Sequence, residues 1–459
     1  MWSSLTRVYP EMQDWVARRG HAGAAAWSRT ASVAQIREVS ARADVTVVQL
    51  HAGFQFQRAS GKAAREMARA AIDAGADLVI GHHPHTTQGL EWYKGKLIAY
   101  SLGNFIFDQD FLATFPTFFL RTVWERHRLV QARLVPLELD RYRPLPVTGT
   151  TARRTLLGAW TDSLQQAQSV RTVSGRVLTV SLRRDHHSRP AQFVLDHDTA
   201  LVTPVPPPVR RISVTIPPRA QVPLDPHLLI DPGTDAPDVL VGRDLFGWGH
   251  FEDTTADGST GHATHWTLRS SGRVLQGAAP TGGGSLQITA AQSRKKATVG
   301  PVARIPLPAH RLTTVTGRPL DPPATYSVQA MVRMSSGARP FLRMSVYHFD
   351  DTDPTEDPVS ALLRNVVKPV TVPADNAWHP VSIELSPSDL GNGGNMVLLH
   401  AGLTGNTASD RFEVDDLAFV EWRRAAGMPH EWGSYQFVRN TGPHATHATF
   451  RSMSATSTR

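Results

Sequence analysis

Two short apolar runs, each followed by histidine, stand out in the pattern of hydrophobic and polar positions. Val45–Leu50 and Leu78–Ile80 are mostly β-branched or aliphatic, and turn residues bound both of them. Runs of this kind are typical of strands in a parallel sheet that is covered on both faces. We therefore expect two neighbouring parallel strands in this part of the chain.

The segment between these runs has the period of an amphipathic helix. Its apolar residues follow the spacing of a single helical stripe, and they are Ala64, Met67, Ala68, Ala71 and Ile72. Gly75 follows at the place where a helix often ends on glycine. The pattern predicts a β-α-β unit, and ligands of open α/β sheets bind at the carboxyl ends of such strands.

Other segments of the first 168 residues also have recognisable patterns. We expect helices over residues 1–20, from a cap at Ser32, and over residues 151–166. Lys94 and Gly95 form a turn that predicts a hairpin between Leu90–Tyr93 and Lys96–Tyr100. Partial alternation over residues 121–139 predicts antiparallel strands.

The pattern changes after a Pro-rich stretch, Pro204–Pro208. From Leu240 to Trp422 short alternating runs recur, separated by Gly, Pro, Asn and Asp clusters, which is typical of an all-β sandwich. We expect four parts: an α/β domain over residues 1–168, a β-containing connector over 169–237, a β-sandwich over 238–423, and a polar, largely disordered tail over 424–459.

Composition narrows the function only slightly. The formal net charge is +8 and comes mainly from arginine, which fits either a genomic bias or attraction to an anionic polymer. No basic run is interleaved with aromatic residues, so we expect no nucleic-acid partner. The chain has no cysteine, which excludes thiolate sites, and we see neither a signal peptide nor a run long enough to span a membrane.

The histidines carry the candidate chemistry. His51 follows the first predicted strand, and His83 and His85 flank Pro84 after the second. Neutral imidazole is a common ligand of transition metals, and three imidazoles at one sheet edge predict a metal site. The alternative is that they are surface or capping histidines of a loop.

Three motifs resemble the poly-γ-glutamate capsule-synthesis (CapA) family, which has a calcineurin-like metallophosphatase fold. They are His51–Gly53, Gly81–Gly89 and Tyr100–Phe105, and the resemblance extends over about residues 25–165. It implies that His51, His83 and His85 are ligands of a divalent metal, which is Mn, Fe or Zn. It also implies that His51, His83 and Asn104 form the catalytic set.

The sequence departs from the family pattern in two respects. Ala52 and Gln55 stand where the family has a bulky aromatic residue and a glutamate, and a glutamine cannot accept a proton as a carboxylate does. The family's N-terminal half, with its Gly-Asp metal motif, has no counterpart, so we expect a truncated chain. A two-metal site needs bridging carboxylate oxygens, and the sequence therefore predicts only half of such a site.

The second half resembles jelly-roll carbohydrate-binding modules. The resemblance rests on Leu245–Glu252 and Phe412–Phe419, which look like the beginning and end of such modules. It implies a structural calcium with Glu252 and Asp416 as oxygen ligands. The alternative is that both are ordinary carboxylates of edge strands.

Three functional hypotheses follow. The first is a metal-dependent, phosphoesterase-like protein of capsule, poly-γ-glutamate or other cell-surface polymer biosynthesis. The second is a catalytically inactive protein that binds a surface glycan, and the third is a fragment of a longer CapA-like enzyme. The expected fold is a partial α/β metallophosphatase-like domain followed by a jelly-roll sandwich. The resemblance implies an extracellular or cell-surface location and an anionic or glycan polymer as partner.

Overall fold

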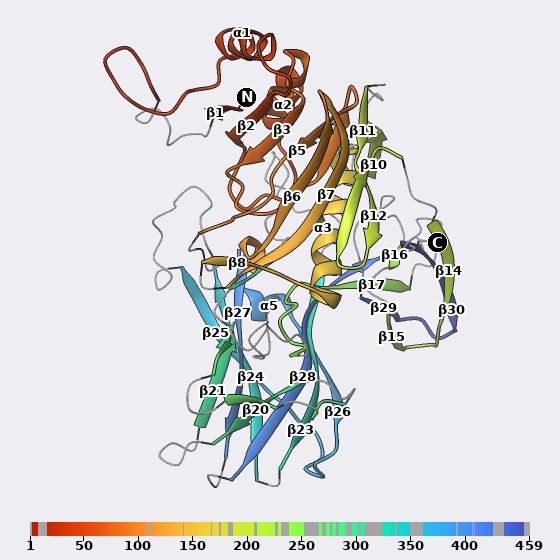
Figure 1. Cartoon of the computed structure of the whole chain (residues 1–459). Helices are drawn as coiled ribbons and strands as arrows, with labels where there is room; N and C mark the ends of the chain where they lie inside the picture. The colour runs from red at the N-terminus through yellow and green to blue at the C-terminus, as the bar shows by residue number, and fades with distance from the viewer. Residues whose placement is uncertain are drawn as a thin grey trace.

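Figure 1 shows the computed structural model of the 459-residue chain, in which an N-terminal α/β unit is followed by a β-sandwich. The described residues are 2–7, 16–107, 109, 112–140, 142–166, 168–173, 176–181, 187–205, 209–224, 228–230, 238–251, 266–268, 272–275, 278–280, 284–290, 296–301, 304–307, 324–335, 337–348, 361–391, 393–405, 407, 409–425 and 436–453.

The first sheet of the α/β unit has the strand order β1-β2-β3-β5-β4-β11. β1, β2, β3 and β5 are parallel, whereas β4 and β11 run antiparallel to their neighbours. The strands are β1 (Trp2–Arg7), β2 (Val47–Ala52), β3 (Leu78–His82), β4 (Leu90–Tyr93), β5 (Lys96–Ala99) and β11 (Ser188–Pro190). The predicted parallel pair and hairpin are both present.

Two helices cover one face of this sheet, α1 (Arg29–Ser40) and α2 (Lys62–Asp73). The expected stripe of α2 is buried, with Met67 and Ile72 among the core residues. Two details of the prediction are wrong. The segment expected as the first helix contains β1, which pairs with β2, and α1 is capped by Ser28 rather than Ser32.

A second, antiparallel sheet completes the unit, with the order β12-β13-β7-β6 and β8 paired to β7. Its strands are β6 (Pro116–Glu125), β7 (Arg128–Asp140), β8 (Arg143–Pro146), β12 (Gln192–Asp196) and β13 (Thr199–Thr203). The helix α3 (Gly149–Gln166) packs against β4, β7 and β12, so its apolar residues share one core with both sheets. The turn η2 (Leu112–Thr114) precedes β6.

The structure divides the predicted connector, residues 169–237, in a different way. β11 pairs with β4 and β13 pairs with β7, so Ser188–Thr203 is part of the N-terminal unit and not of a separate connector. The hairpin of β9 (Gln168–Val173) and β10 (Arg176–Ser181) forms a separate two-stranded sheet. Non-local pairing of this kind leaves no local pattern, which is why the sequence placed the boundary at residue 168.

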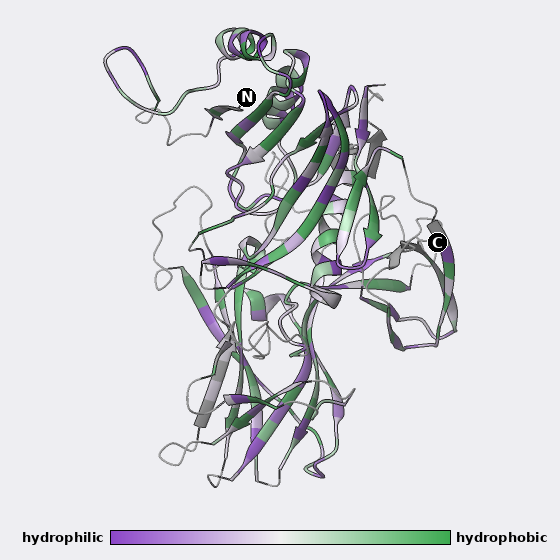
Figure 2. Ribbon diagram, in the orientation of Figure 1, coloured by the Kyte–Doolittle hydropathy of each residue, from purple (hydrophilic) through white to green (hydrophobic). Residues whose placement is uncertain are grey.

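The C-terminal unit is a sandwich of an eight-stranded and a six-stranded sheet, which confirms the predicted fold class. Figure 2 shows apolar residues interspersed with polar ones along its strands, and the apolar side chains fill the core between the sheets. The strands of the larger sheet are β15 (Gln221–Pro223), β17 (Val239–Asp244), β19 (Gly272–Leu275), β20 (Ser285–Thr289), β23 (Thr325–Met334), β26 (His379–Leu385), β28 (Arg411–Arg424) and β29 (Phe437–Asn440). Those of the smaller sheet are β18 (Trp266–Thr267), β21 (Lys296–Pro301), β22 (Ile305–Pro306), β24 (Arg339–Tyr347), β25 (Leu362–Pro369) and β27 (Met396–Thr404), and a short helix α5 (Pro387–Leu390) lies between β26 and β27.

The predicted disordered tail contains two strands. β29 pairs with β15 and β17, and β30 (Thr446–Met453) pairs with β14 (Val209–Ile216) and β16 (Leu228–Ile230). The buried side chains of Ala448 and Phe450 anchor β30. Among the described residues, no helix has the length and apolar character that crossing a membrane requires.

Candidate functional site

The histidines expected from the sequence meet at the carboxyl edge of the first sheet. His51 lies near the end of β2, where it is in register with His82 of β3, and His83 and His85 follow in the next loop. The ring centroids of His51 and His83 are 5.0 Å apart, and those of His83 and His85 are 5.9 Å apart. Two β-strand ends thus bring three imidazoles together.

The loop that carries His83 and His85 has an uncommon backbone. His83 has a φ of 96° and His85 a φ of 59°, and non-glycine residues seldom adopt positive values. Just before the loop, a Cβ atom on Gly81 would lie 1.9 Å from the carbonyl oxygen of Tyr100. Only glycine permits this approach of the backbones. Such strain is often concentrated at functional sites, where the surrounding structure maintains it.

Burial and mutual repulsion keep these imidazoles uncharged. Burial, together with repulsion from His51 and His85, lowers the pKa of His83 to about 4. Burial is also the main cause of the lowered pKa of His51 and of His82. A neutral imidazole has a free lone pair on one nitrogen, which is the form that binds a metal.

Asn104 fixes the orientation of one of the rings. Nδ1 of His85 lies 2.8 Å from Oδ1 of Asn104, and Nδ2 of Asn104 donates to Oε1 of Gln109 at 2.9 Å. Because the amide donates to Gln109, its oxygen faces His85 and accepts the proton on Nδ1. This bond raises the pKa of His85, although burial lowers it by more. The arrangement leaves Nε2 of His85 with its lone pair free.

His82 belongs to the cluster, although the sequence did not single it out. Its Nε2 atom is buried and has no hydrogen-bond partner within the part of the chain that the structure describes. The signal was the adjacent pair His82 and His83 in the Gly81–Gly89 motif, of which only His83 was expected to be a metal ligand. A buried nitrogen without a partner is costly, so such groups need an explanation.

The donor set suits a transition metal in its chemistry but not in the placement of its side chains. Neutral imidazoles are suitable nitrogen ligands, and one of them is fixed by an amide oxygen. However, no three His, Asp or Glu side chains of the described residues are placed to hold a metal ion together. The metal therefore stays a prediction.

Exposed aromatic and aliphatic side chains border the histidines. Phe54, Phe105, Ile106 and Phe107 expose between 41% and 73% of their surface. The ring of Phe107 lies 4.8 Å from that of His85, centroid to centroid. An apolar rim of this kind lowers the local polarity and favours uncharged imidazoles.

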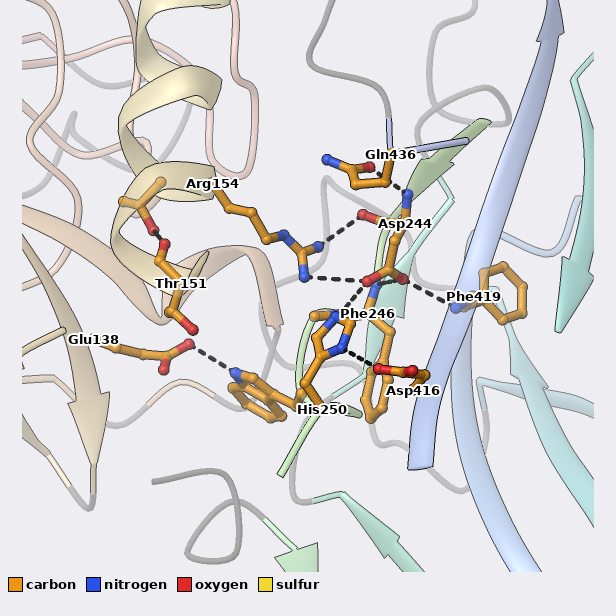
Figure 3. Close-up of polar contacts among 12 residues, drawn as sticks. Glu138, Thr151, Arg154, Asp244, Phe246, His250, Asp416, Phe419 and Gln436 are labelled. Atoms are coloured by element: carbon orange, nitrogen blue, oxygen red, sulfur yellow. Dashed lines mark hydrogen bonds and ion pairs between the residues drawn. The ribbon is translucent and has the colours of Figure 1, made fainter. Parts of the chain in front are cut away.

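The predicted calcium ligands are not both described. Glu252 lies outside the described residues. Asp416 of β28 has a φ of 49°, and its Oδ1 atom lies 2.9 Å from Nδ1 of His250 (Figure 3). The observed partner of this carboxylate is therefore a histidine, and calcium stays a prediction.

The fold and the site together define an α/β unit with an imidazole cluster at its sheet edge, followed by a β-sandwich. Residues 5–109 match the family model described as "Bacterial capsule synthesis protein PGA_cap", which confirms the CapA resemblance for that part of the chain. The PGA biosynthesis protein CapA of Bacillus subtilis (strain 168) is 36% identical over 115 residues, which are 25% of this chain and 30% of that protein. The capsule biosynthesis protein CapA of Bacillus anthracis is 37% identical over 106 residues, which are 23% of this chain and 26% of that protein. The chain thus spans less than a third of the length of these relatives.

Solved structures similar to this chain include carbohydrate-binding modules. TmCBM61, solved in complex with β-1,4-galactotriose, has a TM-score of 0.24 and 13% identity and covers 40% of this chain and 99% of its own. The CBM22-1 xylan-binding domain from Paenibacillus barcinonensis Xyn10C has a TM-score of 0.22 and 17% identity and covers 43% of this chain and 100% of its own. Both similarities are low, and the sandwich is assigned from its own strand pairing.

Proposed function

We propose that this chain acts in the biosynthesis of an anionic capsule polymer at the cell surface and that its histidine cluster is a metal-dependent, phosphoesterase-like site. The observation that carries the proposal is the gathering of three uncharged imidazoles at the carboxyl edge of a parallel sheet. The match of residues 5–109 to the capsule-synthesis family supports the polymer class. Poly-γ-glutamate is the polymer that the family name suggests.

In this proposal His51, His83 and His85 hold a divalent cation such as Mn, Fe or Zn. When bound, the cation would polarise a phosphoryl oxygen and lower the pKa of a bound water. The chain's own residues prepare the site. Asn104 holds His85 in one tautomer, and the ring of Phe107 packs beside His85. Gln55 cannot act as a base, so the proposed site has no proton acceptor at that position.

The test uses the full chain loaded separately with Mn²⁺, Fe²⁺ or Zn²⁺. Metal content is measured after gel filtration, and turnover is measured with bis(p-nitrophenyl) phosphate. We expect bound metal and turnover that both disappear in a His51→Ala/His85→Ala variant. A His127→Ala variant is the matched control, because this exposed histidine lies in the β6–β7 turn. Equal metal content in the double variant and the control would contradict the proposed site.

A second candidate is a protein that binds a surface polymer without catalysis. It is favoured by Gln55 at the position of a carboxylate and by the lack of a three-ligand set among the described residues. Co-sedimentation with poly-γ-glutamate and with insoluble polysaccharides distinguishes the two. Polymer binding that is unchanged by the His51→Ala/His85→Ala substitutions, without turnover in any metal-loaded sample, would favour this second candidate.

A further inference from the structure

Three separate segments of the N-terminal unit carry the residues of the histidine site. They are His51 near the end of β2, His83 and His85 in the loop after β3, and Asn104 after β5. The pairing of β2 with β3 ends at His51 and His82, so the strands themselves do not fix the loops beyond them. A working site needs its side chains held to within about 0.5 Å, and this requires contacts between the loops.

The backbone carbonyl oxygen of Gln57, in the loop after β2, accepts two hydrogen bonds from the loop after β3. Nε2 of Gln88 donates to it at 2.7 Å, and Oγ1 of Thr86 donates to it at 3.2 Å. A carbonyl oxygen has two lone pairs, so it can accept both bonds. Since it cannot donate, the amide nitrogen of Gln88 must be the atom that faces it. Side chains of defined orientation therefore join the two loops.

Backbone contacts join the same two loops. The N–H of Phe56 donates to the carbonyl oxygen of Pro84 at 2.8 Å. A Cβ atom on Gly53 would lie 3.6 Å from Cγ of Pro84, so the loop after β2 packs against the proline ring. Pro84 stands between His83 and His85, whose positive φ values persist only where the surrounding structure maintains them. These contacts supply part of that support.

Gln88 also reaches the third segment. Its backbone N–H donates to the carbonyl oxygen of Ser101 at 3.0 Å. Oγ of Ser101 accepts in turn from the N–H of Gly103, directly before Asn104, at 3.2 Å. Gln88 thus contacts the loop after β2 through its side chain and the segment of Asn104 through its backbone, and it belongs itself to the loop after β3.

Both donor side chains lie in the interior of the unit. Gln88 is 2% exposed and Thr86 is 1% exposed. Water therefore cannot readily replace a lost partner, and a buried polar group without one costs free energy. The two side chains are thus suited to hold the loops at a fixed separation.

We propose that Gln88, assisted by Thr86, is a positioning residue of the histidine site, because its bond to Gln57 sets the distance between His51 and the imidazoles of the next loop. This inference rests on the histidine site of the proposed function, although not on the identity of the metal. Removing the donor frees the loop after β2, so the imidazoles separate while β2 and β3 stay paired.

The test compares the full chain with its Gln88→Met variant, which keeps a side chain of similar length but has no donor. In the metal-free protein with ¹³C-labelled histidine, the rings of His51 and His83 should give a nuclear Overhauser effect, since their centroids are 5.0 Å apart. We expect this effect to be lost in Gln88→Met. The affinity for Zn²⁺, measured against a chromophoric chelator, should fall about tenfold or more, as is typical when support of the ligands is removed.

Gln192→Met is the matched control. Gln192 of β12 is also buried, and its Nε2 atom also donates to a backbone carbonyl, that of Pro190 at 3.4 Å, but it lies in none of the three segments. This variant should lose stability on urea unfolding and yet keep both the Overhauser effect and the Zn²⁺ affinity. If Gln88→Met does not fold, Thr86→Val removes the other bond to the same carbonyl and should weaken the Overhauser effect.

Two results would overturn the proposal. One is an Overhauser effect of unchanged intensity in the folded Gln88→Met variant, or in Thr86→Val if that variant replaces it. The other is an equal loss of the effect in Gln192→Met. Failure of the unaltered chain to bind Zn²⁺ would instead contradict the proposed metal site, and the metal-free comparison would still decide the role of Gln88.

Discussion

Trp248 of the sandwich donates its indole N–H to Oε1 of Glu138 in β7 at 2.7 Å, and both side chains are buried. The ring of Trp248 also lies edge-on to that of Phe115, with centroids 4.9 Å apart. Together with the Arg154–Asp244 pair, these contacts join the two units over a polar and an apolar surface. The sandwich is therefore attached by specific side-chain contacts as well as by the chain itself.

Replacing Trp248 by phenylalanine should destabilise the protein by about 2 kcal/mol. The substitution removes a buried hydrogen bond to a charged group, and such bonds contribute about 1.5–3 kcal/mol. The free energy of unfolding in urea, followed by circular dichroism, measures the change.

Trp92→Phe is the matched control for this prediction. The Nε1 atom of Trp92 is buried and has no hydrogen-bond partner within the described part of the chain, so the same substitution removes bulk but no such bond. We expect a smaller loss of stability in this variant. Equal losses in the two variants would show that the bond to Glu138 contributes nothing beyond packing.

Protonation of His250 should stabilise the fold. Burial lowers the pKa of His250, but the hydrogen bond to Asp416 and the charges of Asp244 and Asp416 outweigh it, so the pKa is raised above 6.5. A group with a raised folded pKa contributes stability that is fully present below its unfolded pKa. That contribution is lost as the pH rises through the folded pKa.

The free energy of unfolding should therefore fall as the pH rises above about 6.5, and the fall should be smaller in a His250→Gln variant. His127→Gln, a change at an exposed turn, should keep the slope of the unaltered chain. The cluster histidines do not interfere in this range. The pKa of each is lowered, that of His83 to about 4, so their effect is a loss of stability on acidification below pH 6.5. A His250→Gln profile parallel to that of the unaltered chain would contradict the prediction.

The elements that were predicted correctly are those whose own residues carry a hydrophobic period or a turn signal. The helix α2, the parallel strands β2 and β3, and the β4–β5 hairpin follow from side-chain period and turn residues. The strand β1 was missed, since Leu5 fits a helical stripe equally well. What makes Trp2–Arg7 a strand is its pairing with β2, more than 40 residues away in the sequence. Propensity is a weak guide where such long-range pairing decides the structure.

The same reasoning explains which parts of the sites could be predicted. His51, His83 and His85 could be grouped because the carboxyl ends of adjacent parallel strands meet at one edge. The contact between His250 and Asp416 could not be predicted. These residues are separated by 165 others in the sequence, and only the folding of the sandwich brings them together. The contact of Trp248 with Glu138 depends on the packing of two units, which no motif encodes.

Gly81→Ala should disrupt both the sheet and the histidine cluster. A Cβ atom at Gly81 would overlap the backbone of Tyr100, which cannot move without shifting β5. We expect a loss of several kcal/mol, about 3 or more, as is typical of severe overpacking. Gly61→Ala is the control, because the nearest atoms to its Cβ are those of Phe54 at 4.0 Å. Thermal unfolding of both variants checks the prediction, and similar stability in the two would contradict it.

Asn104 should control metal affinity through the tautomer of His85. Its Oδ1 atom accepts the proton on Nδ1, which leaves Nε2 free to bind a metal. Removing the acceptor in Asn104→Ala frees the ring to move its proton to Nε2. Loss of such a supporting bond typically lowers metal affinity about 10–100-fold. Competition of Zn²⁺ between the protein and a chromophoric chelator measures this affinity.

A second measurement separates this role from general damage to the fold. In ¹⁵N-resolved NMR of the metal-free protein, His85 should carry its proton on Nδ1 in the unaltered chain and shift toward Nε2 in Asn104→Ala. Asn104→Asp retains an oxygen acceptor and should preserve both the tautomer and most of the affinity. If Asn104→Ala keeps the Nδ1 proton and the full Zn²⁺ affinity, then Asn104 does not position His85, and the bond at 2.8 Å is incidental to metal binding.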